Sequence, residues 1–277
     1  MGESFNTAQR LYELFNEADS VSAKTVNNGL EGWCEVFDVP QESETRSLEE
    51  VARLIRLVDQ ELNQLERELS VTGVKSELYN PEVNRLRKAI DPMYVSSGWN
   101  NVQNRINSQD LRSLEQFTAH LKDSAPERIP DEDLKDVREG IEELFSQLQE
   151  KDLPPWFIEY VRSQLQTITQ SLREYRIVGR KAFGDALREL ATEEFRYTHE
   201  GSDQEVDEEA ESIYSQFQEL TLQLWTWYEV YCASENAIED AHNLFHLIKA
   251  ALPEEDGALL APPSEDAPQL PTPGESA

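Results

Sequence analysis

Apolar residues recur in alternating steps of three and four along most of this sequence. The clearest case is the segment 47–70, where the repeated positions are Leu48, Val51, Ile55, Val58, Leu62, Leu65 and Leu69. This spacing puts the apolar side chains on one face of an α-helix. Ser47 and Glu50 have the spacing of a capping box, and Gly73 favours a helix end. We expect a helix of about 24 residues that packs within a single chain, with an oligomeric coiled coil as the alternative.

Two other long segments show helical spacing. The segment 204–232 carries two apolar stripes, one formed by Ile213, Phe217, Leu220, Leu224, Trp227 and Tyr231 and the other by Tyr214, Trp225, Tyr228 and Cys232. A helix that is apolar on two sides is normally surrounded by other helices, so we expect this one to be central in the fold. The segment 154–194 begins at Pro154-Pro155, a favourable helix entry, and Gly179 and Gly184 predict bends within it.

Shorter helices are expected around these three. They cover about 6–18, 22–38, 81–90, 98–106, 109–122, 131–151 and 235–251, and Asn27-Asn28-Gly29 is a turn signal inside the second of them. No segment alternates apolar and polar residues long enough to predict a strand. The sequence therefore predicts an all-α fold, a bundle of long antiparallel helices with shorter connecting helices.

The composition changes abruptly near the C-terminal end. Residues 253–277 contain six prolines and six acids, and no Lys, Arg or aromatic residue. Such a segment does not bury enough apolar surface to offset the entropy of ordering. We expect one helical domain over 1–252, with a subdivision near 125–130 as the alternative, and a disordered acidic tail over 253–277.

The chain is strongly acidic. It has 55 acidic and 25 basic residues, a formal net charge of −30. This charge repels phosphate backbones and anionic lipid headgroups, so we expect neither nucleic-acid nor membrane-surface binding. No stretch approaches the roughly 18 apolar residues of a membrane span. We expect a cytoplasmic protein whose partner is another protein, with a basic partner favoured by the charge; the sequence does not fix the oligomeric state.

Two basic clusters oppose the overall charge. One contains Arg173, Arg176, Arg180, Lys181 and Arg188, and the other contains Arg85, Arg87, Lys88 and Arg105. Pairing with carboxylates on neighbouring helices is one interpretation. The other is an anion or phosphate site formed by Arg173, Arg176, Arg180 and Lys181. A nucleotide-binding loop is not expected, because the Gly179-x-x-x-x-Gly184 spacing lacks the following Lys and Ser or Thr.

One sequence pattern is suggestive of metal binding. Glu239, His242 and His246 lie on one face of an expected helix. A four-helix di-iron site needs a second Glu-x-x-His motif, which the sequence lacks, and the two histidines flank the apolar seam. Cys34 and Cys232 form no Cys-x-x-Cys pair, so neither thioredoxin-like chemistry nor structural zinc is expected. We expect no cofactor.

The remaining unusual stretch is Tyr94–Asn101, for which we expect a turn that caps the following helix and buries Trp99. No motif of a known reaction centre or characterised family is recognisable. We therefore expect a non-enzymatic interaction protein, such as an adaptor, regulator or accessory subunit. One alternative is an acidic decoy that imitates nucleic acid, which requires its acids to gather on one face. The other is a helical metal protein or enzyme that uses Glu239, His242 and His246.

Overall fold

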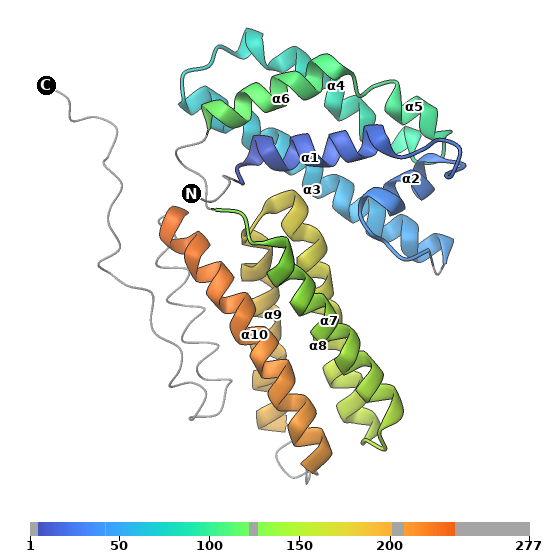
Figure 1. Ribbon diagram of the computed structural model, residues 1–277, viewed down its shortest axis with the longest axis vertical. Coiled ribbons are helices and arrows are strands. Elements are labelled where there is room, and N and C mark those ends of the chain that lie inside the picture. The colour runs from blue at the N-terminus through green and yellow to red at the C-terminus, as the bar shows by residue number, and fades with distance from the viewer. Residues whose placement is uncertain (1–4, 42, 122–126, 201–207, 236–277) are drawn as a thin grey trace, which may run out of the picture. The chain divides into compact units, whose positions relative to one another are not determined.

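The computed structural model describes residues 5–41, 43–121, 127–200 and 208–235. Over these ranges the chain is helical and contains no β-strand (Figure 1). The α-helices are α1 (Thr7–Ser20), α2 (Gly29–Val36), α3 (Glu44–Val71), α4 (Asn80–Ala89), α5 (Trp99–Gln103), α6 (Ser108–His120), α7 (Asp131–Glu150), α8 (Pro155–Val178), α9 (Lys181–Glu200) and α10 (Glu208–Glu235). Two short 3-10 helices, η1 (Ser76–Leu78) and η2 (Pro92–Tyr94), flank α4. The predicted all-α fold of long antiparallel helices is confirmed.

The chain divides into two compact units. Unit 1 comprises Met1–Lys135 together with Ile168–Ala182, and unit 2 comprises Asp136–Thr167 together with Phe183–Ala277. The continuous helix α8 therefore contributes its first half to unit 2 and its second half to unit 1. The expected extent of the helical domain, the helix over 236–251 and the disordered tail stay predictions, because 236–277 lie outside the described residues.

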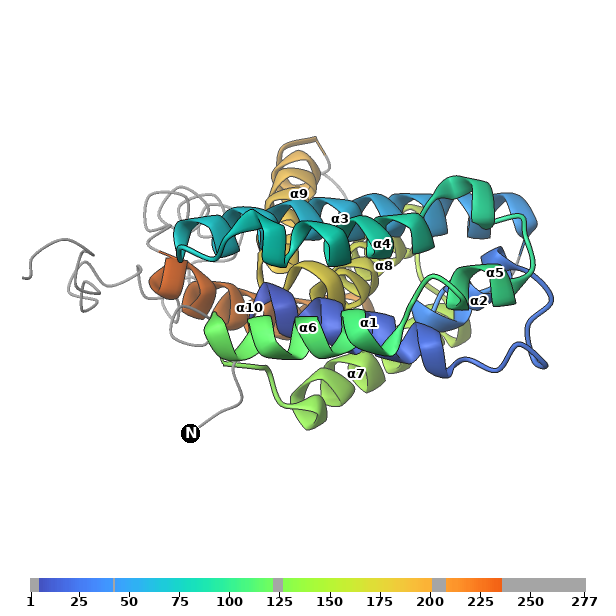
Figure 2. The ribbon, with the colours of Figure 1, turned by 90° about the horizontal axis from the view of Figure 1, so that it is seen from above.

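Unit 1 is built around four helices. Helix α1 packs against α3 and α6, and α4 packs against the same two helices, so that the four enclose one apolar core (Figure 2). Fully buried side chains from these helices include Leu11, Phe15, Leu54, Leu62, Leu65, Leu69 and Leu86. The short helices α2 and α5 contact each other and add Trp33 and Trp99, both almost completely buried, to the same core. The burial of Trp99 was predicted from the sequence.

Helix α3 follows the predicted seam but begins earlier than predicted. Its N-cap is Ser43, whose hydroxyl accepts a hydrogen bond from the Arg46 amide at 3.2 Å. Ser47 is buried inside the first turns and donates to the Pro40 carbonyl at 3.1 Å, so the predicted capping box at Ser47 is wrong. Leu48, assigned to the seam, is 44% exposed. The helix ends as predicted, with Gly73 at φ +80°, a conformation that favours glycine.

The segment 154–194 forms two helices rather than one bent helix. Gly179 adopts φ +68°, which ends α8 and allows α9 to start at Lys181. Gly184 lies within α9, where the ring of Tyr228 from α10 packs so closely that a Cβ atom would overlap it. The first glycine thus supplies a backbone conformation, and the second supplies space for an aromatic ring.

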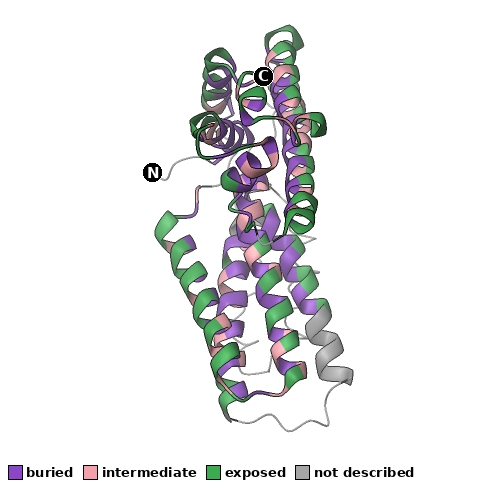
Figure 3. Cartoon of the chain, turned by 90° about the vertical axis from the view of Figure 1, so that its right-hand side faces the viewer, coloured by how far each residue is buried: buried purple, intermediate pink, exposed green. Residues whose placement is uncertain are grey.

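In its described part, unit 2 is a four-helix arrangement of α7, the first half of α8, α9 and α10. Successive helices run antiparallel, and α10 lies beside both α7 and α9 (Figures 1 and 2). Gln147 of α7 donates to Gln216 of α10 at 3.1 Å, and the rings of Phe183 in α9 and Trp227 in α10 are 5.3 Å apart. On α7 and on the first half of α8, the buried residues form one stripe and the opposite side is mostly exposed (Figure 3). Helix α10 buries residues of both predicted stripes, although the side chains of 230–235 are outside the described set.

Candidate interaction site

The basic segment of α8 lies in unit 1, where carboxylates surround it. The guanidinium of Arg176 donates to Glu17 of α1, to the Asp38 carboxylate at 3.2 Å and to the Val36 carbonyl at 3.1 Å. Burial raises the pKa of Glu17, and the adjacent Arg176 opposes that rise only in part. Arg176 therefore binds the second half of α8 to α1 and to the end of α2.

Arg173 lies beside a second ion-pair group on α3. Arg53 forms a salt bridge with Glu50 at 2.8 Å and another with Glu174 of α8, while the Arg173 guanidinium is 3.9 Å from Glu50. The hydrogen bond from Arg53 lowers the pKa of Glu50, and the charge of Arg173 adds to that effect. These contacts join α3 to α8 within unit 1.

Arg180 and Lys181 lie at the turn between α8 and α9. Arg180 is 8% exposed and donates to the Glu127 carbonyl at 3.0 Å, whereas Lys181 is exposed. Arg173 and Arg176 contact carboxylates, as the ion-pair interpretation predicts. An anion site formed by Arg173, Arg176, Arg180 and Lys181 stays a prediction.

A buried ion pair that the sequence analysis missed joins three helices of unit 1. Arg10 of α1 is 9% exposed and lies 2.5 Å from the Glu61 carboxylate of α3, which is 8% exposed. Arg10 also donates at 2.8 Å to the carbonyls of Phe5 and Ile177, the latter near the end of α8. A sequence signal existed, because Glu61 stands three residues after Val58, on the apolar face of α3.

Two residues of the second basic cluster, Arg85 and Arg87, are also paired with acids. Arg85 donates from Nε and from Nη2 to the Oδ1 of Asp110, at 2.9 and 2.6 Å, and the Asp110 side chain is completely buried. Arg87 is 2.7 Å from Glu66 and 3.2 Å from Asp59. These arginines, like Arg10, Arg53 and Arg176, thus have carboxylate partners inside unit 1.

Exposed acids are densest on α7 in unit 2. Asp136, Glu139, Glu143 and Glu150 are all exposed and follow steps of three, four and seven, which places them on one face of the helix. We call these four residues the α7 acidic face. Other exposed acids are distributed over further helices and include Glu49, Glu115, Glu159, Asp185, Glu211 and Glu219. This distribution does not support the decoy alternative, which requires one acidic face on the molecule.

Within the described residues no metal-binding group is formed. No three His, Cys, Asp or Glu side chains there are grouped to hold a metal ion, and the predicted ligands Glu239, His242 and His246 lie outside those residues. Cys34 is buried, and burial raises the pKa of its thiol, which disfavours the reactive thiolate.

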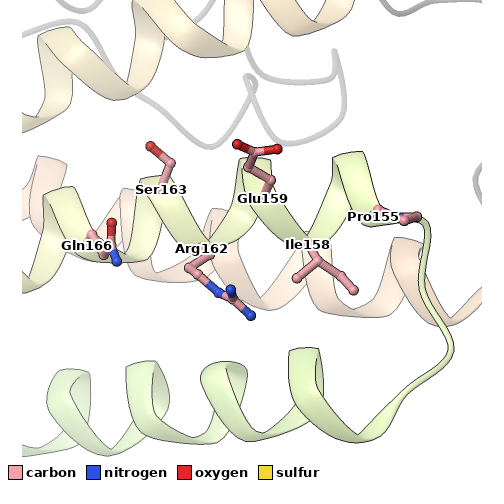
Figure 4. A pocket seen from close by; sticks show the side chains of 6 residues that line it. All are labelled: Pro155, Ile158, Glu159, Arg162, Ser163 and Gln166. Carbon is pink, nitrogen blue, oxygen red and sulfur yellow. The ribbon is translucent and has the colours of Figure 1, made fainter.

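A hollow of about 580 Å³ lies along the start of α8. Its lining residues in the described part all come from this one helix and include Glu159, Arg162 and Ser163. Figure 4 shows Glu159 and Ser163 on one side of the helix and Arg162 on the other. These polar groups diverge, whereas a catalytic or ligand site needs groups that converge on one point.

None of the helices in the described ranges combines the length and the apolar character that a membrane crossing requires. Comparison of the chain with protein-family models, with curated proteins and with solved structures finds no match.

Proposed function

We propose that this chain is a non-enzymatic protein that binds another protein, of basic character, in the cytoplasm, and that the α7 acidic face contributes to this binding. The observation that carries the proposal is the exposure of four acids in helical register on α7. The side chains of Glu61, Asp110 and Glu174 in unit 1, by comparison, are largely buried beside an arginine.

An exposed row of like charge suits recognition more than stability. Like charges three or four residues apart on a helix repel each other and destabilise it slightly. A partner with Lys or Arg side chains at matching positions relieves that repulsion and associates faster because opposite charges attract at long range. The proposal assigns α7 this role as an adaptor or regulatory surface.

The test compares two neutralised variants of the full chain. The first carries Asp136→Asn, Glu139→Gln, Glu143→Gln and Glu150→Gln. The control carries Glu49→Gln, Glu77→Gln, Glu115→Gln and Glu211→Gln, which removes the same number of charges from other exposed positions. Both variants are expected to keep the helical circular dichroism of the parent.

Each protein is used as bait in extracts of its own source cells, and captured proteins are quantified by mass spectrometry. The parent and the control should retain the same basic proteins, and these should elute as salt is raised. The α7 variant should lose them. An α7 variant that captures the same proteins in the same amounts as the parent would contradict the proposal.

A further inference from the structure

The start of α2 contains the only Asn-Gly pair in the sequence, Asn28-Gly29. In such a pair the backbone nitrogen of the glycine readily attacks the asparagine side chain, because the glycine has no Cβ to hinder the approach. An Asn-Gly pair in a flexible peptide therefore deamidates spontaneously, and faster than asparagine before a larger residue. The chain thus carries a reactive pair whose rate depends on the local structure.

Deamidation proceeds in two steps. The Gly29 nitrogen loses its proton and its lone pair attacks Cγ of Asn28; the bond from Cγ to Nδ2 then breaks and ammonia leaves, which gives a five-membered succinimide. Water opens this ring at either carbonyl and produces aspartate or isoaspartate. The first step needs a free Gly29 amide. It also needs the Asn28 backbone to rotate until the Gly29 nitrogen is nearly eclipsed with the Asn28 Cβ.

The fold opposes both requirements. The Gly29 amide is buried and donates to the Ser97 carbonyl at 2.6 Å. Asn28 has φ −142° and ψ 175°, an extended backbone that keeps the Gly29 nitrogen staggered with respect to Cβ. The side chain of Asn28 is held as the N-cap, because its oxygen accepts from the Glu31 amide at 2.9 Å and its nitrogen donates to the Glu31 carboxylate at 3.3 Å. The helix start is therefore unreactive in this arrangement.

The contacts that hold this arrangement come from segment 94–99. A Cβ atom on Gly29 would lie 2.2 Å from the Tyr94 carbonyl oxygen, and one on Gly32 would overlap the Trp99 ring. The two glycines are three residues apart on one face of α2, and α2 lies beside α5 (Figures 1 and 2). The backbone of α2 approaches segment 94–99 with no space for added atoms. The pair becomes free to react only when the two separate.

We propose that Asn28-Gly29 is a site of spontaneous modification controlled by this contact: it deamidates when the start of α2 separates from segment 94–99, and isoaspartate formed there makes the separation permanent. The main chain of isoaspartate runs through Cβ and carries one extra atom between positions 28 and 29. The docked helix start has no room for that atom. Aspartate keeps the normal backbone and is a good N-cap, so this product docks again.

Peptide mapping by mass spectrometry, which separates the asparagine, aspartate and isoaspartate forms, measures the reaction in the full chain. At mildly alkaline pH, Asn28 of the folded chain should be modified at least about 100-fold more slowly than Asn28 of the same chain unfolded in guanidinium chloride, as expected for a segment that opens rarely. Similar rates in the folded and the unfolded chain overturn the proposal.

Two glycine substitutions test whether the contact controls the rate. Gly32→Ala places a methyl group against the Trp99 ring and should accelerate modification of Asn28 about 5- to 150-fold. Gly98→Ala, whose added Cβ meets no atom within 4 Å, is the matched control and should leave the rate within about 5-fold of the parent. Equal rates in the two variants contradict the proposal. Equal acceleration at Asn107, the N-cap of α6, would also overturn it, because unit 1 would then open as a whole.

Amide hydrogen exchange, followed by nuclear magnetic resonance, tests the permanent separation. The Gly29 amide should exchange slowly in the parent and in Asn28→Asp, which carries the aspartate product. In purified full chains with isoaspartate at position 28, the same amide should exchange at nearly the rate of an unstructured peptide. Slow exchange of the Gly29 amide in the isoaspartate form would show that the helix start docks again and would overturn the permanent separation.

Discussion

At the scale of single residues, a glycine in unit 1 packs directly against a tryptophan ring. A Cβ atom on Gly32 of α2 would overlap the ring of Trp99, which also packs edge-on against Trp33 with ring centroids 5.5 Å apart. The indole nitrogen of Trp99 donates to the Val21 carbonyl at 3.3 Å, so the ring is held on more than one side. A side chain at position 32 has no direction in which to displace the indole without cost.

We expect Gly32→Ala to destabilise the protein by about 1 to 3 kcal/mol, because the added methyl overpacks a filled site. The measurement is urea unfolding followed by tryptophan fluorescence. Gly98→Ala is the matched control, since its φ of −63° suits alanine and no atom lies within 4 Å of the added Cβ. Gly98→Ala should change stability by less than about 1 kcal/mol, because the smaller entropy of the unfolded chain opposes the lower preference of an N-cap for alanine. Equal changes in the free energy of unfolding for the two variants would show that Trp99 moves aside for the added methyl group at little cost.

Glu17 and Glu50 are expected to affect stability with opposite dependence on pH. The raised pKa of Glu17 means that folding favours its protonated form, so its contribution is lost as pH rises through that pKa. The lowered pKa of Glu50 means that folding favours its carboxylate, so its contribution is present at neutral pH and lost as pH falls through that pKa.

The corresponding substitutions separate the two cases. Glu17→Gln should raise the free energy of unfolding at pH 7 relative to the parent, and the difference should shrink in acid. Glu50→Gln should lower it at pH 7, and that difference should also shrink in acid. Urea unfolding at several pH values between 3.5 and 7.5 checks both; the same sign for both variants at pH 7 would refute the assignment.

At the scale of helices, spacing in the sequence predicted which elements form better than where they end. The seam of α3 and its end before Gly73 follow from local rules that need no partner. Its start does not, because Ser43 and Ser47 both have capping chemistry, and the choice depends on the Pro40 carbonyl that binds Ser47. The same uncertainty applies to Gly179. A glycine in the sequence is equally compatible with a bend within one helix and with the end of that helix.

The ion pairs were predictable only as a class. The sequence indicated that basic clusters on an acidic chain meet carboxylates, and Arg173 and Arg176 do so. It gave no means of pairing Arg176 with Glu17, because the two residues lie far apart along the chain and are brought together by helix packing. A sequence shows the net charge of each segment, whereas the acid that each arginine contacts is determined by the tertiary structure.

The Arg10–Glu61 pair connects α1 and α3, and Arg10 also binds the last turn of α8. We expect Arg10→Met to lower the free energy of unfolding by about 3 to 5 kcal/mol, because Glu61 is left as a buried charge without its partner. Arg10→Met with Glu61→Leu should recover part of the loss. Arg112→Met, at an exposed position on α6, should change stability by less than about 0.5 kcal/mol. Chemical unfolding monitored by circular dichroism distinguishes these outcomes.

At the scale of the whole molecule, the net charge of −30 opposes compact folding through self-repulsion. Salt screens exposed charges more than buried pairs, so we expect the melting temperature to rise when sodium chloride increases from 20 to 500 mM, values chosen to span a Debye length of roughly 20 Å down to roughly 4 Å. The variant with four neutralised acids on α7 should show a smaller rise. A melting temperature that falls with salt would mean that surface ion pairs dominate over repulsion.

The shared helix α8 also bears on how the protein is made. Unit 1 needs Ile168–Ala182, which are synthesised only after Asp136–Thr167 of unit 2. At ribosomal speeds of about 5 to 20 residues per second, the first 135 residues wait roughly 2 to 10 s for that segment. During this interval the nascent chain carries Glu17 without Arg176 and Arg10 without the Ile177 carbonyl, a period in which chaperones have access to an incomplete core.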